Sequence, residues 1–129
     1  MPNGSAPLQV LVVDDEPLMC WSLTETLGDD GDVVTEAQSG HAAIGVLADA
    51  PEPDVVLLDY HLPDSQNLDV LSMVKRLAPH SQIIVMSAYC TPEITKQALA
   101  LGACRVVSKP INMCDLPAIV RQAAGSSLH

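Results

Sequence analysis

The stretch LQVLVVDD at residues 8–15 decides the fold, because an apolar run of strand length ends there in two adjacent carboxylates, Asp14 and Asp15. A second apolar run, VVLLD at residues 55–59, ends in the carboxylate of Asp59. Runs that are apolar at nearly every position are typical of strands buried on both faces of a parallel sheet. If the two strands deliver their carboxylates to one edge of a sheet, the like charges repel each other and need a counterion. A divalent cation with oxygen ligands is the commonest answer, so the sequence predicts a metal site there.

The rest of the chain alternates between apolar, β-branched runs and helical patterns. We expect strands near 8–13, 32–37, 54–58, 82–86 and 104–108, and helices near 17–27, 40–49, 67–78, 91–101 and 113–124. This alternation predicts an α/β protein with a flavodoxin-like, doubly wound, five-stranded parallel sheet in the order 2-1-3-4-5, covered on both faces by the five helices. Ligands of such sheets bind where the strand order reverses, which is between the first and third strands. The second strand alternates polar and apolar residues and is expected at an edge.

One helix start is ambiguous. If the last helix began near residue 113, Pro117 would lie at about its fifth position and would remove a backbone hydrogen bond. Either that helix begins nearer Asp115, or its first turn is distorted.

Size and charge limit the classes of function. The 129 residues suffice for one domain, which we place at 8–124, with an N-terminal extension at 1–7 and a tail or start of a linker at 125–129; an output domain, if there is one, would lie beyond His129. A net charge of −10 repels phosphate backbones and anionic lipids, so we expect no direct contact with nucleic acid or membrane. The apolar runs are far shorter than the roughly 20 residues of a membrane helix, and residues 1–7 lack the features of a signal peptide. A cytoplasmic location is therefore expected.

The four cysteines do not form a C-x-x-C pair. Without an oxidising compartment, the simplest interpretation is that they are small buried hydrophobes, and we assign them no function. They are Cys20, Cys90, Cys104 and Cys114.

Five short motifs follow one another in a characteristic order. They are VVDDEP at 12–17, LLDYHLPD at 57–64, MSAY at 86–89, GA at 102–103 and SKP at 108–110. Together they resemble the response-regulator receiver domain of two-component signalling, from about Leu8 to Ala124. The stretch IVMSAY at 84–89 is also similar to receivers attached to bacterial enhancer-binding ATPases.

The resemblance implies a phosphoacceptor and a metal site. Asp59 would take a phosphoryl group from a phosphohistidine, which makes an aspartyl phosphate. Mg²⁺ would be held by the carboxylates of Asp15 and Asp59, by the backbone carbonyl of His61, and by Asp14 through a water molecule. The ring of His61 is expected to face solvent.

The resemblance also implies the groups that respond to the phosphoryl group. Lys109 would pair with Asp59 at rest and with a phosphoryl oxygen afterwards, and Pro110 would follow it through a cis bond that aims the lysine inward. Ser87 would donate its hydroxyl to the phosphoryl group and pull its loop inward. Ala88 keeps the position beside Ser87 small, and Tyr89 belongs to the same switch region.

Two positions depart from what the resemblance and the helical pattern suggest. Most receivers carry Phe or Tyr three residues before the lysine, where this chain has Val106, so the aromatic half of the switch is expected to be absent. Trp21 falls on the helix face opposite the apolar stripe of Met19, Leu23 and Leu27, and is a candidate for kinase docking.

The function expected from this resemblance is a receiver that changes the face formed by its fourth helix, fifth strand and fifth helix to control an output. Its partners would be a histidine kinase or phosphotransfer protein and, on phosphorylation, a second copy of the chain. It would not be an enzyme beyond catalysing its own phosphoryl transfer and dephosphorylation. Two alternatives stay open: a receiver-like interaction domain that phosphate does not control, and a magnesium phosphohydrolase with an aspartyl nucleophile. The second usually has an Asp where this chain has His61.

Overall fold

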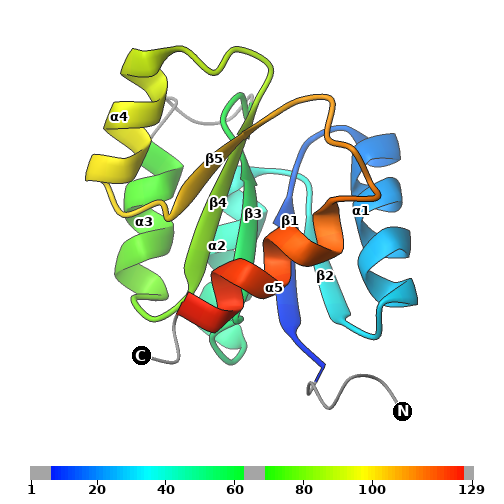
Figure 1. Cartoon of the computed structure of the whole chain (residues 1–129). Coiled ribbons are helices and arrows are strands. Elements are labelled where there is room, and N and C mark those ends of the chain that lie inside the picture. The colour runs from blue at the N-terminus through cyan, green and yellow to red at the C-terminus, as the bar shows by residue number, and fades with distance from the viewer. Residues whose placement is uncertain (1–6, 63–68, 127–129) are drawn as a thin grey trace.

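Five strands and five helices alternate along the chain in the computed structural model, which describes residues 7–62 and 69–126. The strands are β1 (Gln9–Val13), β2 (Val33–Ala37), β3 (Val55–Asp59), β4 (Gln82–Ser87) and β5 (Arg105–Ser108). The helices are α1 (Pro17–Asp29), α2 (Gly40–Asp49), α3 (Asp69–Leu77), α4 (Pro92–Ala100) and α5 (Leu116–Ser126). All strands are parallel and form one sheet in the order β2-β1-β3-β4-β5 (Figure 1). The predicted fold class and strand order are confirmed, and so is the edge position of β2.

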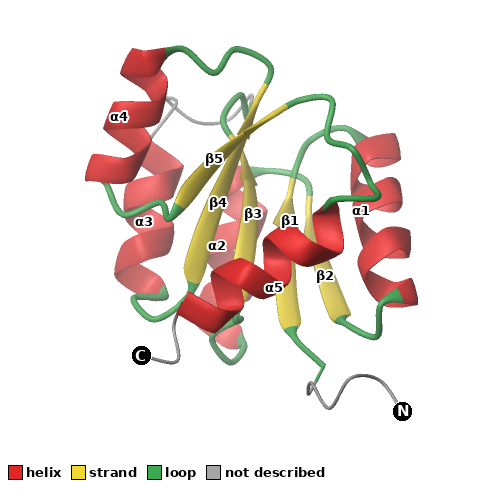
Figure 2. Ribbon diagram, in the orientation of Figure 1, coloured by secondary structure: helices red, strands yellow, loops and turns green. Residues whose placement is uncertain are grey.

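Two apolar layers hold the helices against the sheet. On one face, Leu23 and Leu27 of α1 and Val120 of α5 pack with residues of β1, β3 and β4. On the other, residues of α2, α3 and α4, such as Leu71 and Ala98, pack against the opposite side of the same strands. Figure 2 shows the strands between these two sets of helices. Because side chains alternate between the faces, β1, β3 and β4 must be apolar at successive positions, which explains their continuous apolar sequence.

The start of α5 resolves the ambiguity at Pro117. The helix begins at Leu116, so the proline lies in its first turn, where a missing N–H removes no helical bond. The N–H of Ile119 donates to the carbonyl of Asp115 at 3.1 Å, which is the first bond of this helix. Of the two alternatives, the later start is correct. The helix also continues to Ser126, two residues past the predicted end, so residues 125 and 126 extend α5.

The cysteines were predicted to be buried, and this is wrong for three of them. Cys20 on α1 is fully buried, whereas Cys90, Cys104 and Cys114 are exposed. The three exposed residues lie in loops next to β4, β5 and α5, outside both apolar layers.

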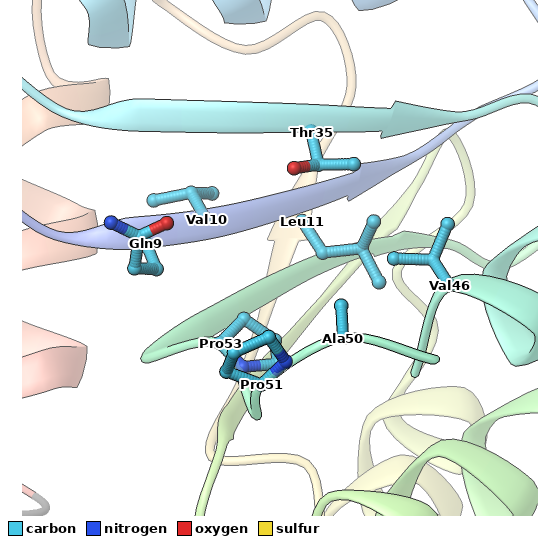
Figure 3. A pocket seen from close by; sticks show the side chains of 8 residues that line it. All are labelled: Gln9, Val10, Leu11, Thr35, Val46, Ala50, Pro51 and Pro53. Carbon is cyan, nitrogen blue, oxygen red and sulfur yellow. The ribbon is translucent and has the colours of Figure 1, made fainter. Parts of the chain in front are cut away.

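A hollow of about 560 Å³ lies beside the amino-terminal half of β1 (Figure 3). It is lined by Gln9, Val10, Leu11, Thr35, Val46, Ala50, Pro51 and Pro53. The predicted metal site follows the opposite, carboxyl end of β1, so this hollow is separate from it. None of the helices within the described residues is long and apolar enough to cross a membrane.

Candidate functional site

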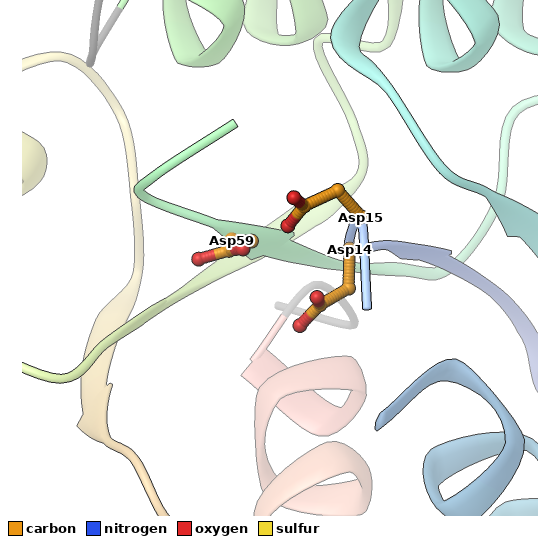
Figure 4. A group of neighbouring side chains, drawn as sticks. All are labelled: Asp14, Asp15 and Asp59. Atoms are coloured by element: carbon orange, nitrogen blue, oxygen red, sulfur yellow. The ribbon is translucent and has the colours of Figure 1, made fainter. Parts of the chain in front are cut away.

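Three carboxylates meet at the carboxyl edge of the sheet. Asp14 and Asp15 directly follow β1, and Asp59 is the last residue of β3. The two strands are neighbours in a register that pairs Val13 with Leu58, so their ends lie side by side. One oxygen atom from each carboxylate lies within 4.8 Å of the others. Figure 4 shows the three side chains. The expectation that the sheet brings these three side chains together is confirmed.

The three carboxylates differ in their exposure to solvent. Asp14 is 0% exposed and Asp59 is 4% exposed, whereas Asp15 is exposed at the surface. Burial raises the pKa of Asp59, and the charge of Asp14 raises it further; the hydrogen bond from the His61 N–H and the charge of Lys109 oppose these effects without cancelling them. The ionised form of Asp59 is therefore less stable here than in water.

Lys109 supplies the positive charge of the cluster. Its Nζ lies 2.9 Å from Oδ2 of Asp14, 3.3 Å from Oδ1 of Asp59 and 3.5 Å from Oε1 of Glu16. Burial lowers the pKa of Lys109, but the hydrogen bond to Asp14 and the charges of Asp59 and Asp14 outweigh burial, and the pKa lies above its usual value. The ammonium is thus held charged between two buried carboxylates.

These contacts extend the pairing expected from the sequence. The predicted contact between Lys109 and Asp59 is present, but the contact with Asp14 is shorter. Glu16 was not predicted to take part. The only signal for it was the third acidic residue in the run Asp14, Asp15, Glu16.

Asp14 is held by four groups from four parts of the chain. Its N–H donates to the carbonyl of Ala37 at 3.0 Å, and its Oδ1 accepts from the N–H of Glu16 at 2.9 Å. Its Oδ2 accepts from Lys109, and its backbone carbonyl accepts from Sγ of Cys20 at 3.1 Å. Burial, followed by the charges of Asp14 and Glu36, raises the pKa of Cys20 to about 11, so the thiol keeps its proton at neutral pH.

Ser87 ends β4, next to the strand that carries Asp59. It is fully buried, and its neighbour Met86 is in register with Asp59. Its Oγ accepts a hydrogen bond from the N–H of Tyr89 at 3.1 Å, which leaves the hydroxyl proton available to another acceptor. Its carbonyl accepts from the N–H of Lys109 at 2.9 Å. Ser87 and Lys109 are therefore linked through the backbone as well as by their shared edge of the sheet.

His61 lies beside the carboxylates and is exposed, in agreement with the solvent-facing position expected from the sequence. Its N–H donates to Oδ1 of Asp59 at 3.1 Å. Its ring makes edge contacts with the rings of Tyr60, at a centroid distance of 4.7 Å, and of Tyr89, at 6.0 Å. Tyr89 itself is 68% exposed, and Ala88 is exposed next to Ser87.

The remaining predicted residues lie outside the carboxylate cluster. Val106 on β5 is partly buried and packs against the apolar layer that includes α4. The peptide bond between Lys109 and Pro110 is cis. Trp21 on α1 is 61% exposed, whereas Leu23 on the same helix is fully buried, so its predicted exposure is confirmed.

The donor set fits a hard divalent cation. Mg²⁺ prefers carboxylate, carbonyl and water oxygens in octahedral geometry. The cluster offers three carboxylates, one of them exposed to solvent, and burial keeps the pKa of Asp59 raised although Lys109 lies beside it. A second cation beside Lys109 would stabilise the ionised carboxylates of this cluster.

Comparisons with known proteins agree with this geometry. The family model of the response regulator receiver domain matches residues 10–121. The transcriptional regulatory protein PdtaR of Mycobacterium tuberculosis (strain ATCC 25618 / H37Rv) is 34% identical over 121 residues, which cover 91% of this chain and 57% of PdtaR. The transcriptional regulatory protein KdpE of the same strain is 39% identical over 114 residues, which cover 88% of this chain and 50% of KdpE. The chain therefore spans about half the length of these curated relatives.

The fold is also found among solved structures. A CheY-like response regulator receiver domain protein from Methanospirillum hungatei JF-1 matches with a TM-score of 0.89. The match covers 95% of this chain and 98% of that one at 23% sequence identity. This comparison supports the fold, and the family model supports the family.

We expect Asp59→Asn to stabilise the metal-free protein at neutral pH. A carboxyl group whose folded pKa is raised costs stability while it is ionised, and it regains that stability as the pH falls through the folded pKa. Asn removes the buried charge, and Lys109 keeps its shorter contact with Asp14. The midpoint of thermal unfolding, followed by circular dichroism with a chelator at pH 7, should rise by a few degrees, since about 1 kcal/mol corresponds to roughly 4 °C in a domain of this size.

The matched control is Glu25→Gln, which makes the same change of charge at an exposed position of α1. The difference in unfolding midpoint between Asp59→Asn and this control should become smaller as the pH falls toward 3.8, the ordinary pKa of an aspartic acid. An equal shift of the midpoint in both variants at pH 7 would contradict the interpretation.

Proposed function

The chain belongs to the response regulator receiver domain family, and on this basis we propose that the carboxylate of Asp59 accepts a phosphoryl group from the phosphohistidine of a histidine kinase or phosphotransfer protein. The observation that carries the proposal is the cluster of Asp14, Asp15 and Asp59, of which Asp14 and Asp59 contact the ammonium of Lys109. The proposed nucleophile, oxygens suited to a metal ion and a compensating cation thus share one edge of the sheet.

The transfer is proposed to combine the nucleophile of this edge with a phosphohistidine donor and a bound metal ion. An oxygen of Asp59 attacks phosphorus, an O–P bond forms, and the P–N bond to the donor imidazole breaks with its electron pair left on nitrogen. The product is a mixed anhydride on Asp59. The N–H of His61, which now donates to Oδ1 of Asp59, fixes the orientation of the carboxylate before the attack.

The metal proposed for this site is Mg²⁺. Asp15, Asp59 and the backbone carbonyl of His61 would hold it directly, and Asp14 would hold it through a water molecule. When bound, Mg²⁺ supplies positive charge that offsets the charge on the phosphoryl oxygens. The support is the oxygen-rich donor set and the burial that keeps the pKa of Asp59 raised although Lys109 lies beside it.

Lys109 and Ser87 are proposed to respond to the new phosphoryl group. The ammonium of Lys109 would move from the carboxylates to a phosphoryl oxygen, as suits a point charge on a flexible stem. Ser87 would donate its free hydroxyl proton to another oxygen and bring the loop of Ala88 and Tyr89 with it. His61 and Tyr89, whose rings touch, would influence the access of water and hence the lifetime of the phosphoryl group.

The output is proposed to be the face formed by α4, β5 and α5, with Val106 and Pro110 within it or next to it. A second copy of the chain would bind this face after phosphorylation, and an output region of a longer polypeptide, like those of the relatives, would respond to it. Exposed Trp21 on α1 is the proposed contact with the kinase. A cytoplasmic location is part of the same proposal.

The alternatives receive less support. The phosphohydrolase usually needs a second Asp two residues after the nucleophile, and the side chain there is His61, whose ring packs against Tyr60 and Tyr89. An interaction domain that phosphate does not control would have no need of a buried, charged cluster that costs stability. The chain is therefore proposed to catalyse only its own phosphoryl transfer and dephosphorylation.

We expect acetyl phosphate with MgCl₂ to add about one phosphoryl group, roughly 80 Da, to the parent chain. Intact-mass spectrometry should show a hydroxylamine-labile adduct that depends on the metal and is absent from Asp59→Asn. Asp49→Asn, at an exposed position on α2, is the control and should be labelled like the parent. Equal labelling of Asp59→Asn and the parent would refute the assignment. If neither acetyl phosphate nor phosphorylated kinases gave an adduct, the interaction domain would be the better account.

We expect Lys109→Met to bind Mg²⁺ more tightly than the parent. The substitution removes a positive charge that lies 2.9 Å from Asp14 and 3.3 Å from Asp59 and repels a second cation. A change of about 1.4 kcal/mol is tenfold in affinity, so calorimetric titration with MgCl₂ should show a Kd lower by about tenfold.

Lys96→Met, which removes a lysine exposed on α4, is the control for net charge and should leave the Kd within about twofold. Weaker binding by Lys109→Met than by the parent would show that the lysine helps to form the metal site and does not compete for it.

We expect Val106→Tyr to strengthen dimerisation that follows phosphorylation. The side chain of Val106 packs against the apolar layer that includes α4, and it cannot alternate between exposed and buried positions as an aromatic ring can. Sedimentation velocity with and without acetyl phosphate and MgCl₂ should show a larger dimer fraction for this variant, while Arg105→Tyr, an exposed neighbour on β5, should behave like the parent. If the dimer fraction of Val106→Tyr equalled that of the parent, the missing aromatic at position 106 would not explain any difference in dimerisation.

A further inference from the structure

A buried thiol on α1 contacts the backbone of the carboxylate cluster. Sγ of Cys20 donates to the backbone carbonyl of Asp14 at 3.1 Å, and Cys20 is 0% exposed. The contact spans six positions along the chain, and the N–H of Cys20 separately makes the helical bond to the carbonyl of Glu16. The thiol is thus an additional link between the first turns of α1 and the end of β1.

This contact holds the backbone carbonyl of Asp14, while other parts of the chain hold its N–H and its carboxylate. β2 fixes its N–H through Ala37, while Glu16 and Lys109 fix its carboxylate. The carbonyl of Asp14 belongs to the peptide group that leads to Asp15. Because a peptide group is planar, its orientation sets the direction in which the chain leaves Asp14 and therefore where Asp15 begins.

We propose that Cys20 is a positioning residue for the carboxylates of Asp14 and Asp15. It touches neither of these carboxyl groups, and it acts by fixing the peptide group between the two residues against α1. The proposal rests on the proposed function, since the pair matters as part of the metal site. Cys20 packs in the same apolar layer as Leu23 and Leu27, and of these three side chains only that of Cys20 carries a hydrogen-bond donor.

Cysteine suits this position for two reasons. It packs like a small hydrophobe, which a fully buried position among leucines requires. It also keeps one weak donor for a carbonyl that would otherwise lose a partner in a buried place. Alanine would lose the donor, whereas serine would keep it. The two substitutions therefore separate the hydrogen bond from the packing.

The first measurement uses the metal-free protein. Amide hydrogen exchange by NMR should show the buried Asp14 N–H exchanging about tenfold faster in Cys20→Ala than in the parent, after scaling to the amides of β3. Cys20→Ser should restore the parent rate to within about threefold. Leu23→Ala removes a buried side chain from the same helix without touching Asp14, so it should lower global stability and leave the scaled rate unchanged.

The second measurement is a titration of the same four proteins with MgCl₂, followed by NMR. Cys20→Ala should raise the Kd by about threefold to tenfold, a smaller loss than the roughly 10- to 100-fold seen when partners of metal-binding side chains are removed, because the thiol acts through the backbone. Cys20→Ser should lie within about twofold of the parent, and so should Leu23→Ala.

The two measurements separate this inference from the proposed function. Equal Kd and equal scaled exchange in Cys20→Ala and the parent would overturn the positioning role, as would an effect of Leu23→Ala as large as that of Cys20→Ala. If the parent itself failed to bind Mg²⁺, the proposed function would fall, and the metal-free exchange would decide the role of Cys20 by itself.

Discussion

The rest of the site depends on the burial of two carboxylates beside a single ammonium. Asp14 and Asp59 are removed from water at the ends of neighbouring strands, and Lys109 lies within 3.3 Å of both. Burying a charge is costly unless it is paired, and one cation cannot fully compensate two anions. Burial is the largest cause that raises the pKa of Asp59, and the charge of Lys109 does not cancel it. The ionised carboxylate of Asp59 therefore reduces the stability of the fold and attracts a further cation.

The strand order makes this arrangement unavoidable. With β1 beside β3 and β4 beside β5, the carboxyl ends of four strands present the Asp14–Asp15 pair, Asp59, Ser87 and Lys109 along one edge. The apolar layers on both faces of the sheet keep the strands in register, so the core sets the backbone positions of these residues, which end the strands or directly follow them. A site built in this way needs little reorganisation before chemistry, which is the condition for effective electrostatic stabilisation.

Sequence patterns predicted the fold and the meeting of the carboxylates because both follow from strand periodicity and from the order of parallel strands. They could not predict that Lys109 lies closer to Asp14 than to Asp59, since a flexible stem can reach several acceptors and the choice depends on distances of a few tenths of an ångström. The contact of Cys20 with a backbone carbonyl was missed for a similar reason. Cysteine's general tendency to be buried holds for Cys20 and fails for Cys90, because loop position overrides residue type.

The absence of an aromatic at position 106 places more of the proposed switch on the backbone. The N–H of Lys109 bonds to the carbonyl of Ser87, and Oγ of Ser87 bonds to the N–H of Tyr89. A phosphoryl group that recruited the ammonium and the hydroxyl would therefore act on the ends of β4 and β5 together, because these two ends are already joined. Val106 lies on the same short strand as Ser108 and packs against the apolar layer that includes α4. A shift of the end of β5 would therefore displace Val106 against this layer without the rotation of a ring.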